Sequence, residues 1–558
     1  MSRAHDHPRL ILALVCLPVF IGALDLTIVS AVLPEVIRSL TIEIQKLDVA
    51  GWVVTGYFVS YAISMTFMGK VSDLAGRRAV FLACLAIFFV GSWLVAVSPG
   101  WPAGAARQVM RLVGDHSGDG FGALYALIFG RVVQAFGAGA MVPVSMALVA
   151  DLFPADRRAL PLGIVGAVDT AGWVLGHLYG GIMVQFMTWP YLFWINLPIV
   201  LVVFGLTWWG LAGLPASSLH PGAPAPGRAT GSIDWIGVAL VSAALILLNI
   251  GLGAPEAAGA TRSSTQSTTS SGHAALWILG SAAAFAVFLF SQKRVRDPLL
   301  ALRIFADRNV SAASAVNLLV GFCIMVGLVS VPIFINVAGG ADTMKAALVT
   351  GYLLCAFTVP MALAAIPGGW LSDRAGYRVS VVAGLVVALA GFWMMSRWKT
   401  PMASQAVSLL APGAGGGSVS GGIAGVVFMA AGLALAGIGI GLTIAPIGTA
   451  VINGVGEGER GMAASLVIIL RLVGMSVSMS SMTAYGLRRT TILSRQMLKP
   501  EDALDFEKTA QVALDSVTKV TSEIALIALA VAAVAAAVAL LLRRGETRES
   551  NIPVRSRS

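Results

Sequence analysis

GKVSDLAGRR, residues 69–78, recurs three hundred positions later as GWLSDRAGYR, residues 369–378. Six of the ten positions are identical, and each copy directly follows an apolar run long enough to cross a bilayer. Parallel structural repeats in a helical membrane protein leave this kind of internal similarity. The two motifs therefore predict a fold of two six-helix halves, with two additional helices inserted between them.

The composition excludes a water-soluble globule. Only 11% of the 558 residues are charged and 57% are hydrophobic, whereas soluble domains carry about a quarter charged residues. The net charge of +10 comes mostly from basic residues beside apolar runs, which favours an explanation by membrane topology over nucleic-acid binding. The four cysteines lie singly in apolar segments, so we expect neither a metal site nor a disulfide framework.

Apolar runs of about twenty residues predict fourteen spans of an all-α polytopic membrane protein. The expected spans are 10–33, 50–69, 79–98, 121–148, 160–186, 191–213, 233–253, 273–291, 310–335, 346–368, 379–397, 423–450, 462–486 and 520–542. Their even number places both termini on one side, and the distribution of Lys and Arg predicts that this side is the cytoplasm. The first run is too long for a signal-peptide core, so we expect it to be retained.

The composition of the loops suggests where the chain divides. A Pro/Gly/Ser-rich segment at the start of the inserted region separates the halves. The expected units are an N-terminal bundle (1–213), a linker with two extra helices (214–309), a C-terminal bundle (310–542) and a cytoplasmic tail (543–558).

Four outer loops are long enough to hold structure of their own. The loops 98–120, 254–272 and 399–422 are rich in small residues, whereas 487–519 contains a candidate helix starting at Pro500. We interpret this helix as a short surface helix packed on the protein, with contact to lipid or to a partner as the alternative.

The repeated motif suggests a conformational latch on the cytoplasmic side. Its glycines allow close helix approach and tight turns, and Asp73 or Asp373 could sit at the start of the next helix and pair with a motif arginine. The alternative is an ordinary charged turn. The residues assigned to the latch are Gly69, Asp73, Gly76, Arg77, Arg78, Asp373, Gly376 and Arg378.

A carboxylate, Asp25, interrupts the first apolar run in LDLTIVSAVLP, residues 24–34. A charge at mid-bilayer costs at least about 2.5–3.5 kcal/mol, so ionisable residues within spans are functional candidates. The others are Arg131, Asp169, His177 and Arg471.

Asp169, Trp173 and His177 are spaced by four and share one helix face. Asp169 is a candidate second proton site or a partner for Arg471. His177 is a candidate relay, with a hydrogen-bonded packing role as the alternative.

Four stretches resemble one known family. LDLTIVSAVLP, GKVSDLAGRR, RVVQAFGAGA (131–140) and LFWINLPIV (192–200) resemble the major facilitator superfamily, in particular its fourteen-helix drug:proton antiporter branch of EmrB/QacA type. Two motifs depart from that branch: GHLYGG (176–181) has His177 where proline is expected, and TWPY (188–191) lacks an arginine. The stretch 42–65 looks closer to members of the same family that export lipid across the bacterial envelope.

The resemblance implies the major facilitator fold in a bacterial inner membrane and proton-driven export by alternating access. It also implies that Arg131 faces the first helix, so that Asp25 carries the proton and Arg131 tunes it. A static ion pair that fixes helix register is the alternative. No phosphate-binding loop is evident, so we expect no cofactor beyond the proton gradient, and a monomer.

The substrate is less well specified than the fold. The buried charges of Asp25, Asp169, Arg131 and Arg471 sum to zero, which suits neutral, weakly cationic or amphiphilic apolar molecules. Candidate cavity residues are Trp52, Phe58, Trp173 and Phe357.

We interpret the chain as a multidrug-type exporter. One alternative is a lipid exporter, with a periplasmic lipid-binding partner. A non-transporting sensor on a transporter scaffold is less favoured, and an enzyme is not expected because no nucleophile–base or metal cluster is evident.

Overall fold

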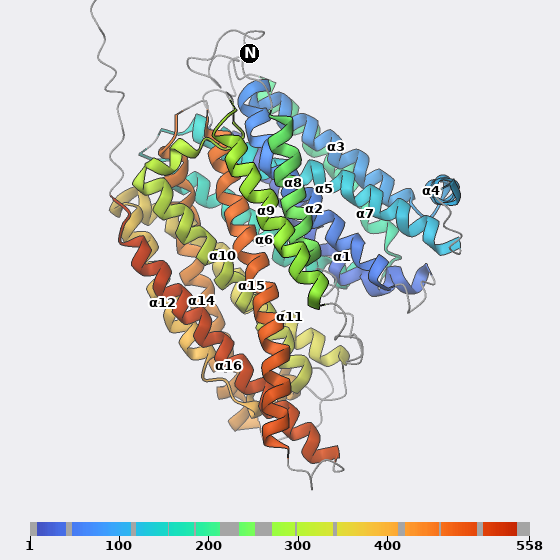
Figure 1. Ribbon diagram of the computed structural model, residues 1–558, viewed down its shortest axis with the longest axis vertical. Coiled ribbons are helices and arrows are strands. Elements are labelled where there is room, and N and C mark those ends of the chain that lie inside the picture. Colours follow the sequence, from blue (N-terminus) through green and yellow to red (C-terminus); the bar gives the residue numbers. More distant parts are fainter. Residues whose placement is uncertain are drawn as a thin grey trace, which may run out of the picture.

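Long helices packed side by side make up the molecule (Figure 1). The computed structural model describes residues 8–40, 47–112, 119–154, 156–183, 186–212, 234–251, 271–295, 298–338, 343–410, 419–456, 459–498 and 506–543. Within these ranges, all the regular structure is helical. Helices are the expected solution in lipid, because an apolar segment must satisfy its backbone hydrogen bonds internally.

The helices follow the predicted runs in order. The first half contains α1 (Pro8–Ser39), α2 (Leu47–Ala75), α3 (Arg77–Val97), α4 (Trp101–Leu112), α5 (Asp119–Leu152), α6 (Ala159–Met183) and α7 (Pro190–Ala212). The inserted region contains α8 (Trp235–Gly251), α9 (Ser271–Gln292) and a short 3-10 helix, η3 (Leu302–Ala306). The second half contains α10 (Arg308–Ala338), α11 (Thr343–Ala375), α12 (Tyr377–Met395), α13 (Thr400–Leu410), α14 (Val419–Asn453), α15 (Arg460–Met497) and α16 (Phe506–Ala539).

Ten of the described helices are long and apolar enough to cross a membrane. Three shorter apolar stretches, Ala159–Trp173, Trp235–Leu248 and Leu276–Gln292, lie in α6, α8 and α9. The prediction of an all-helical polytopic membrane protein is confirmed. The length and composition of the described helices do not establish fourteen spans, so that count stays a prediction.

The outer loops differ from expectation in two respects. The loops at 98–120 and 399–422 contain the helices α4 and α13. The prediction of a separate surface helix before the last span is wrong, because α16 runs without a break from Phe506 to Ala539. Pro500, its expected first residue, lies outside the described residues. Residues 506–539 contain neither Gly nor Pro, so no strong helix breaker ends the helix at the expected boundary.

Each copy of the repeated motif ends one helix and begins the next. The turn is made by Gly76 between α2 and α3 (φ 91°) and by Gly376 between α11 and α12 (φ 87°). Residues with a Cβ atom rarely adopt this positive φ, whereas glycine does so at little cost. The motif therefore fixes a sharp helix-to-helix connection at the same place in both halves.

Two further motif glycines bring the halves together. A Cβ atom on Gly69 of α2 would overlap the carbonyl oxygen of Gly461 in α15. A Cβ atom on Gly369 of α11 would overlap the backbone at Ala159 of α6. The two pairs of helices cross between halves at equivalent positions, so the internal repeat of the sequence appears as a pseudo-symmetric contact.

The close approach of α2 and α15 predicts that Gly69→Ala is destabilising. The added methyl group must push the two backbones apart, at a cost of roughly 1–3 kcal/mol. Thermal unfolding of the purified protein should show a lower Tm. Gly205→Ala in α7 is the matched control, because no neighbouring atom lies within 4 Å of the position of its Cβ; an equal Tm for both variants would contradict the prediction.

Candidate functional site

A buried ion pair joins α1 to α5. Arg131 Nη1 lies 2.6 Å from Asp25 Oδ2, and both side chains are 0% exposed. Arg131 Nη2 also donates a hydrogen bond to the main-chain oxygen of Asp25, at 3.2 Å. The arginine thus binds both the charge and the backbone of α1, which fixes the register of the two helices.

Neutral side chains from two more helices add hydrogen bonds to this pair, although Arg131 Nε is buried without a hydrogen-bond partner. Asn196 of α7 donates from Nδ2 to Asp25 Oδ1 at 3.3 Å. Gln134 accepts a bond from Arg131 Nη1 at 2.7 Å and donates to Ser92 Oγ of α3 at 2.9 Å. Four helices therefore meet at one charge pair, which has hydrogen-bond partners on both sides.

Aromatic rings shield the guanidinium from its other directions. The guanidinium carbon of Arg131 lies 3.9 Å from the ring centroid of Tyr57 in α2 and 5.7 Å from that of Phe193 in α7. A cation over an aromatic face is stabilised by the ring quadrupole, and more so where water is excluded. If Asp25 became protonated, Gln134 and these rings would still stabilise the positive charge of Arg131.

Sequence reasoning selected Asp25 and Arg131 but missed their neutral neighbours. Gln134 and Asn196 both lie inside the quoted motifs, at 131–140 and 192–200. A detectable signal was present, because an amide side chain inside an apolar span needs a buried partner. Gln134 is also one helical turn from Arg131, which places the two side chains on the same face.

Asp169 and Arg471 form a second, looser charge pair between the halves. Asp169 lies on α6 and Arg471 on α15, and their opposite charges attract each other. No direct ion pair joins them within the described structure, and Asp169 Oδ1 and Arg471 Nε are buried there without a hydrogen-bond partner. The residue His177 belongs to α6, but its side chain lies outside the described part of the chain.

The four aromatic residues proposed for the substrate cavity have different surroundings. Phe357 is fully buried, while Trp52 is 41% exposed. Phe58 and Trp173 are half-buried. Their assignment to a cavity stays a prediction.

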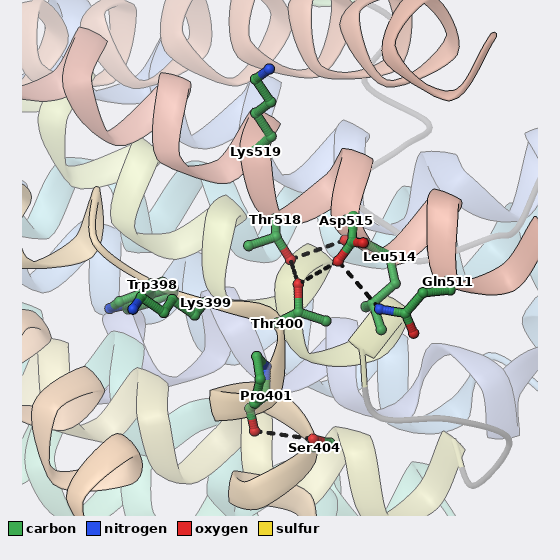
Figure 2. Close-up of a pocket in the computed structure, with 10 residues that line it drawn as sticks. All are labelled: Trp398, Lys399, Thr400, Pro401, Ser404, Gln511, Leu514, Asp515, Thr518 and Lys519. Atoms are coloured by element: carbon green, nitrogen blue, oxygen red, sulfur yellow. Dashed lines mark hydrogen bonds between the residues drawn. The ribbon is translucent and has the colours of Figure 1, made fainter. Parts of the chain in front are cut away.

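Figure 2 shows a pocket of about 680 Å³ between α13 and the N-terminal part of α16. Thr400 donates a hydrogen bond to Asp515 at 2.9 Å, and Lys399 and Lys519 also line the pocket. Its lining contains charged and hydroxyl groups and none of the predicted site residues. Such a lining is poorly suited to an apolar cargo.

The first copy of the motif connects the halves through Asp73. Its carboxylate accepts hydrogen bonds from the backbone N–H groups of Gly461 (3.1 Å) and Met462 (3.2 Å), at the start of α15. Arg77 Nη2 lies 2.5 Å from Asp73 Oδ1. A carboxylate at a helix N-terminus satisfies free N–H groups and interacts favourably with the helix dipole.

The second copy makes the equivalent contact in the opposite direction. Asp373 accepts bonds from the N–H groups of Ala159 (3.2 Å) and Leu160 (3.1 Å), at the start of α6. The expectation that either aspartate caps the next helix of its own half is therefore wrong, because each one caps a helix of the other half.

The motif arginines have separate surroundings. Arg77 pairs with the motif aspartate, whereas the guanidinium of Arg78 lies 5.3 Å from the ring centroid of Trp208. Arg378 is exposed. Three arginines were expected to pair with an aspartate of the motif, and Arg77 does so with Asp73.

The side chains around these caps differ in charge between the two copies. In the first, Asp151 Oδ2 lies 3.1 Å from Arg77 Nε, and its Oδ1 lies 2.8 Å from Arg460 Nη1. In the second, Asn453 Oδ1 accepts from Arg158 Nη1 at 2.6 Å, and Asn453 Nδ2 donates to the Tyr377 hydroxyl at 2.7 Å. The geometry repeats, but an amide replaces the carboxylate and a phenol replaces an arginine.

Known proteins resemble this chain over most of its length. A sequence model of the Major Facilitator Superfamily matches residues 15–479. The triacylglyceride transporter of Mycobacteroides abscessus is 30% identical over 475 residues, covering 85% of this chain and 81% of the relative. The triacylglyceride transporter of Mycobacterium tuberculosis is 30% identical over 474 residues, covering 85% and 82%.

Among solved structures, the proton:xylose symporter XylE has a TM-score of 0.55 and 14% sequence identity, and the match covers 94% of this chain and 95% of that one. At this identity the likeness concerns the fold alone.

The unequal surroundings of the two aspartates predict unequal effects of removing their charge. Asp73→Asn should loosen the contact between halves by roughly 1.5–3 kcal/mol, the usual contribution of a hydrogen bond to a charged group. Asp373→Asn should have a smaller effect, since Asp373 forms the cap but is not paired with an arginine of the motif. Distances between spin labels at Ala75 and Arg374, both exposed, should show the wider separation in Asp73→Asn.

The control for these variants is Glu35→Gln, which removes a carboxylate of α1 that pairs with the exposed Arg38. Its distance distribution should match that of the unmodified chain. A distribution for Asp73→Asn that is narrower than, or equal to, that of Asp373→Asn would contradict the assignment.

Proposed function

This chain belongs to the major facilitator superfamily, and we propose that it is a proton-coupled exporter of neutral lipid. Membership makes it a secondary transporter, and the proton gradient is the energy source that we propose. The observation that carries the coupling proposal is the fully buried pair of Asp25 and Arg131. Breaking such a pair leaves an uncompensated buried charge, which costs several kcal/mol unless other groups take over.

The surroundings of Asp25 support a role in proton transfer. A proton on the carboxylate would remove its charge while Gln134, Tyr57 and the backbone oxygen of Asp25 still bind the arginine. The site can therefore hold two protonation states without leaving Arg131 unpartnered.

Two helices connect the proton site to the latch. α5 carries Arg131 of the ion pair and, at its C-terminal end, Asp151 of the latch. α2 likewise carries Tyr57 beside the ion pair and, at its C-terminal end, Asp73 of the latch. A shift of either helix when Asp25 gains a proton would move the latch residues with it. Protonation and cargo then each favour one arrangement of the halves, as alternating access requires.

A neutral lipid cargo is supported by two observations. The relatives that are 30% identical carry the name triacylglyceride transporter. Asp25 is paired with Arg131, and the charges of Asp169 and Arg471 are opposite but make no direct ion pair in the described structure. The charges of these two acidic and two basic residues sum to zero, whereas a site for dications would be expected to carry surplus negative charge, so the lipid alternative is favoured over multidrug export.

We place the protein in a bacterial inner membrane, with both termini and the latch in the cytoplasm. Net movement of a lipid toward the outer side would require an acceptor there, such as a periplasmic lipid-binding partner. The halves, 1–213 and 310–542, would rock as a monomer about the Asp25 site, with 214–309 inserted between them.

Cargo identity can be tested in inside-out vesicles with an imposed pH gradient. We expect a labelled triacylglycerol to become protected from a membrane-impermeant external reductant, because export moves it to the lumenal side. A dicationic dye should not accumulate above the level of vesicles without the protein. Accumulation of the dye without movement of lipid would support multidrug export instead.

Loss of the Asp25 charge should abolish the dependence on the pH gradient. In the same vesicles, Asp25→Asn cannot release a proton, so gradient-driven lipid movement should fall to the level of protein-free vesicles. Asp156→Asn, on the exposed surface, should transport normally. Full gradient-driven transport by Asp25→Asn in correctly folded protein would contradict the coupling mechanism.

A further inference from the structure

The helix α4 lies at the end of the bundle opposite the latch. α3 begins at Arg77, within the latch motif, and ends at Val97; α4 begins four residues later at Trp101. So short a connection places α4 beside the end of a membrane span. In Figure 1 α4 is seen nearly end-on while α3 runs along the picture, so α4 lies across the direction of the span.

One face of α4 packs on the protein. Ala103 is buried (3% exposed). The aliphatic part of the Arg107 side chain lies against Gly122 of α5, where a Cβ atom would overlap it. These two residues are spaced by four and define the face turned toward the bundle.

A second face is apolar and largely exposed. Trp101 is 64% exposed and Val109 is 58% exposed. Ala105, midway between them, is also exposed. The spacing of four puts all three residues on one strip of the helix.

The neighbouring exposed strip of α4 is different in character. It contains Gly104 and the polar residue Gln108, which are both exposed and again spaced by four. α4 therefore has a face toward the protein, an apolar strip and a polar strip.

We propose that α4 lies in the membrane–water interface, with Trp101, Ala105 and Val109 inserted among the lipids. We infer that lipid covers this strip because the strip adjoins the side of α3 that faces away from the bundle. Trp93 of α3 is 37% exposed and Val90 is 46% exposed, and the ring centroids of Trp93 and Trp101 are 6.1 Å apart.

The chemistry of this surface fits lipid. Tryptophan favours the headgroup level of a bilayer, where its ring meets apolar chains and its N–H meets water. An amphipathic helix lying in the interface plane buries its apolar strip at that level. The inference concerns the boundary of the molecule with its membrane and is independent of the transported substrate.

The proposal can be tested by attaching an environment-sensitive fluorophore to single cysteines in proteoliposomes. Val109→Cys reports on the apolar strip and Gly104→Cys on the polar strip, in a background with Cys355→Ala because the other native cysteines are buried. We expect the label at 109 to be quenched more by lipid-attached nitroxide and less by aqueous iodide than the label at 104. The ratio of lipid to iodide quenching should differ severalfold.

Two outcomes would overturn the proposal. Equal or reversed ratios at 109 and 104 would show that the apolar strip faces water. Protection of the label at 109 from both quenchers would show that protein covers it, from this chain or a second copy. If Val109→Cys fails to fold, Ala105→Cys on the same strip makes the same measurement.

Discussion

The arrangement depends on keeping one pair of opposite charges out of water. Asp25 and Arg131 have no exposed surface, so each must be balanced by groups that the protein itself provides. Asn196, Gln134 and the ring of Tyr57 provide these groups from three further positions in the first half. Since an uncompensated charge in this place would be costly, the packing of these helices and the charge state of the site constrain each other.

The repeated motif also supplies hydrogen-bond partners to buried polar groups, here the N–H groups at the starts of two helices. A helix that begins at the contact between halves has free N–H groups that need acceptors. Asp73 supplies them for α15 and Asp373 supplies them for α6, each from the opposite half. The halves can separate only if these N–H groups gain other acceptors, which water provides when the contact opens. Each half thus completes the hydrogen bonding of a helix in the other half.

Much of the fold followed from local signals, and much of the site did not. Long apolar runs and the repeated motif predicted the helices and the halves, because both signals are read within a few dozen residues. The acceptors of α6 and α15 lie more than two hundred residues away from them in the sequence, so their pairing emerges only on folding. Gln134 and Asn196 were missed because an amide has no charge to mark it. α4 was missed because the glycines of its loop suggested an irregular segment.

The second copy of the latch has a further consequence for the internal symmetry. Where Arg77 donates to Ser72 Oγ at 2.6 Å, the equivalent residue is Tyr377, and Ser372 Oγ is buried without a hydrogen-bond partner in the described structure. Asn453 and Tyr377 carry no charge near neutral pH, whereas Asp151 bridges two arginines. The charges around Asp151 are buried, so salt screens them little. The two halves therefore meet at two seams of one geometry and different side-chain chemistry: buried ion pairs surround the cap between α2 and α15, whereas neutral hydrogen bonds of Asn453 surround the cap between α6 and α11.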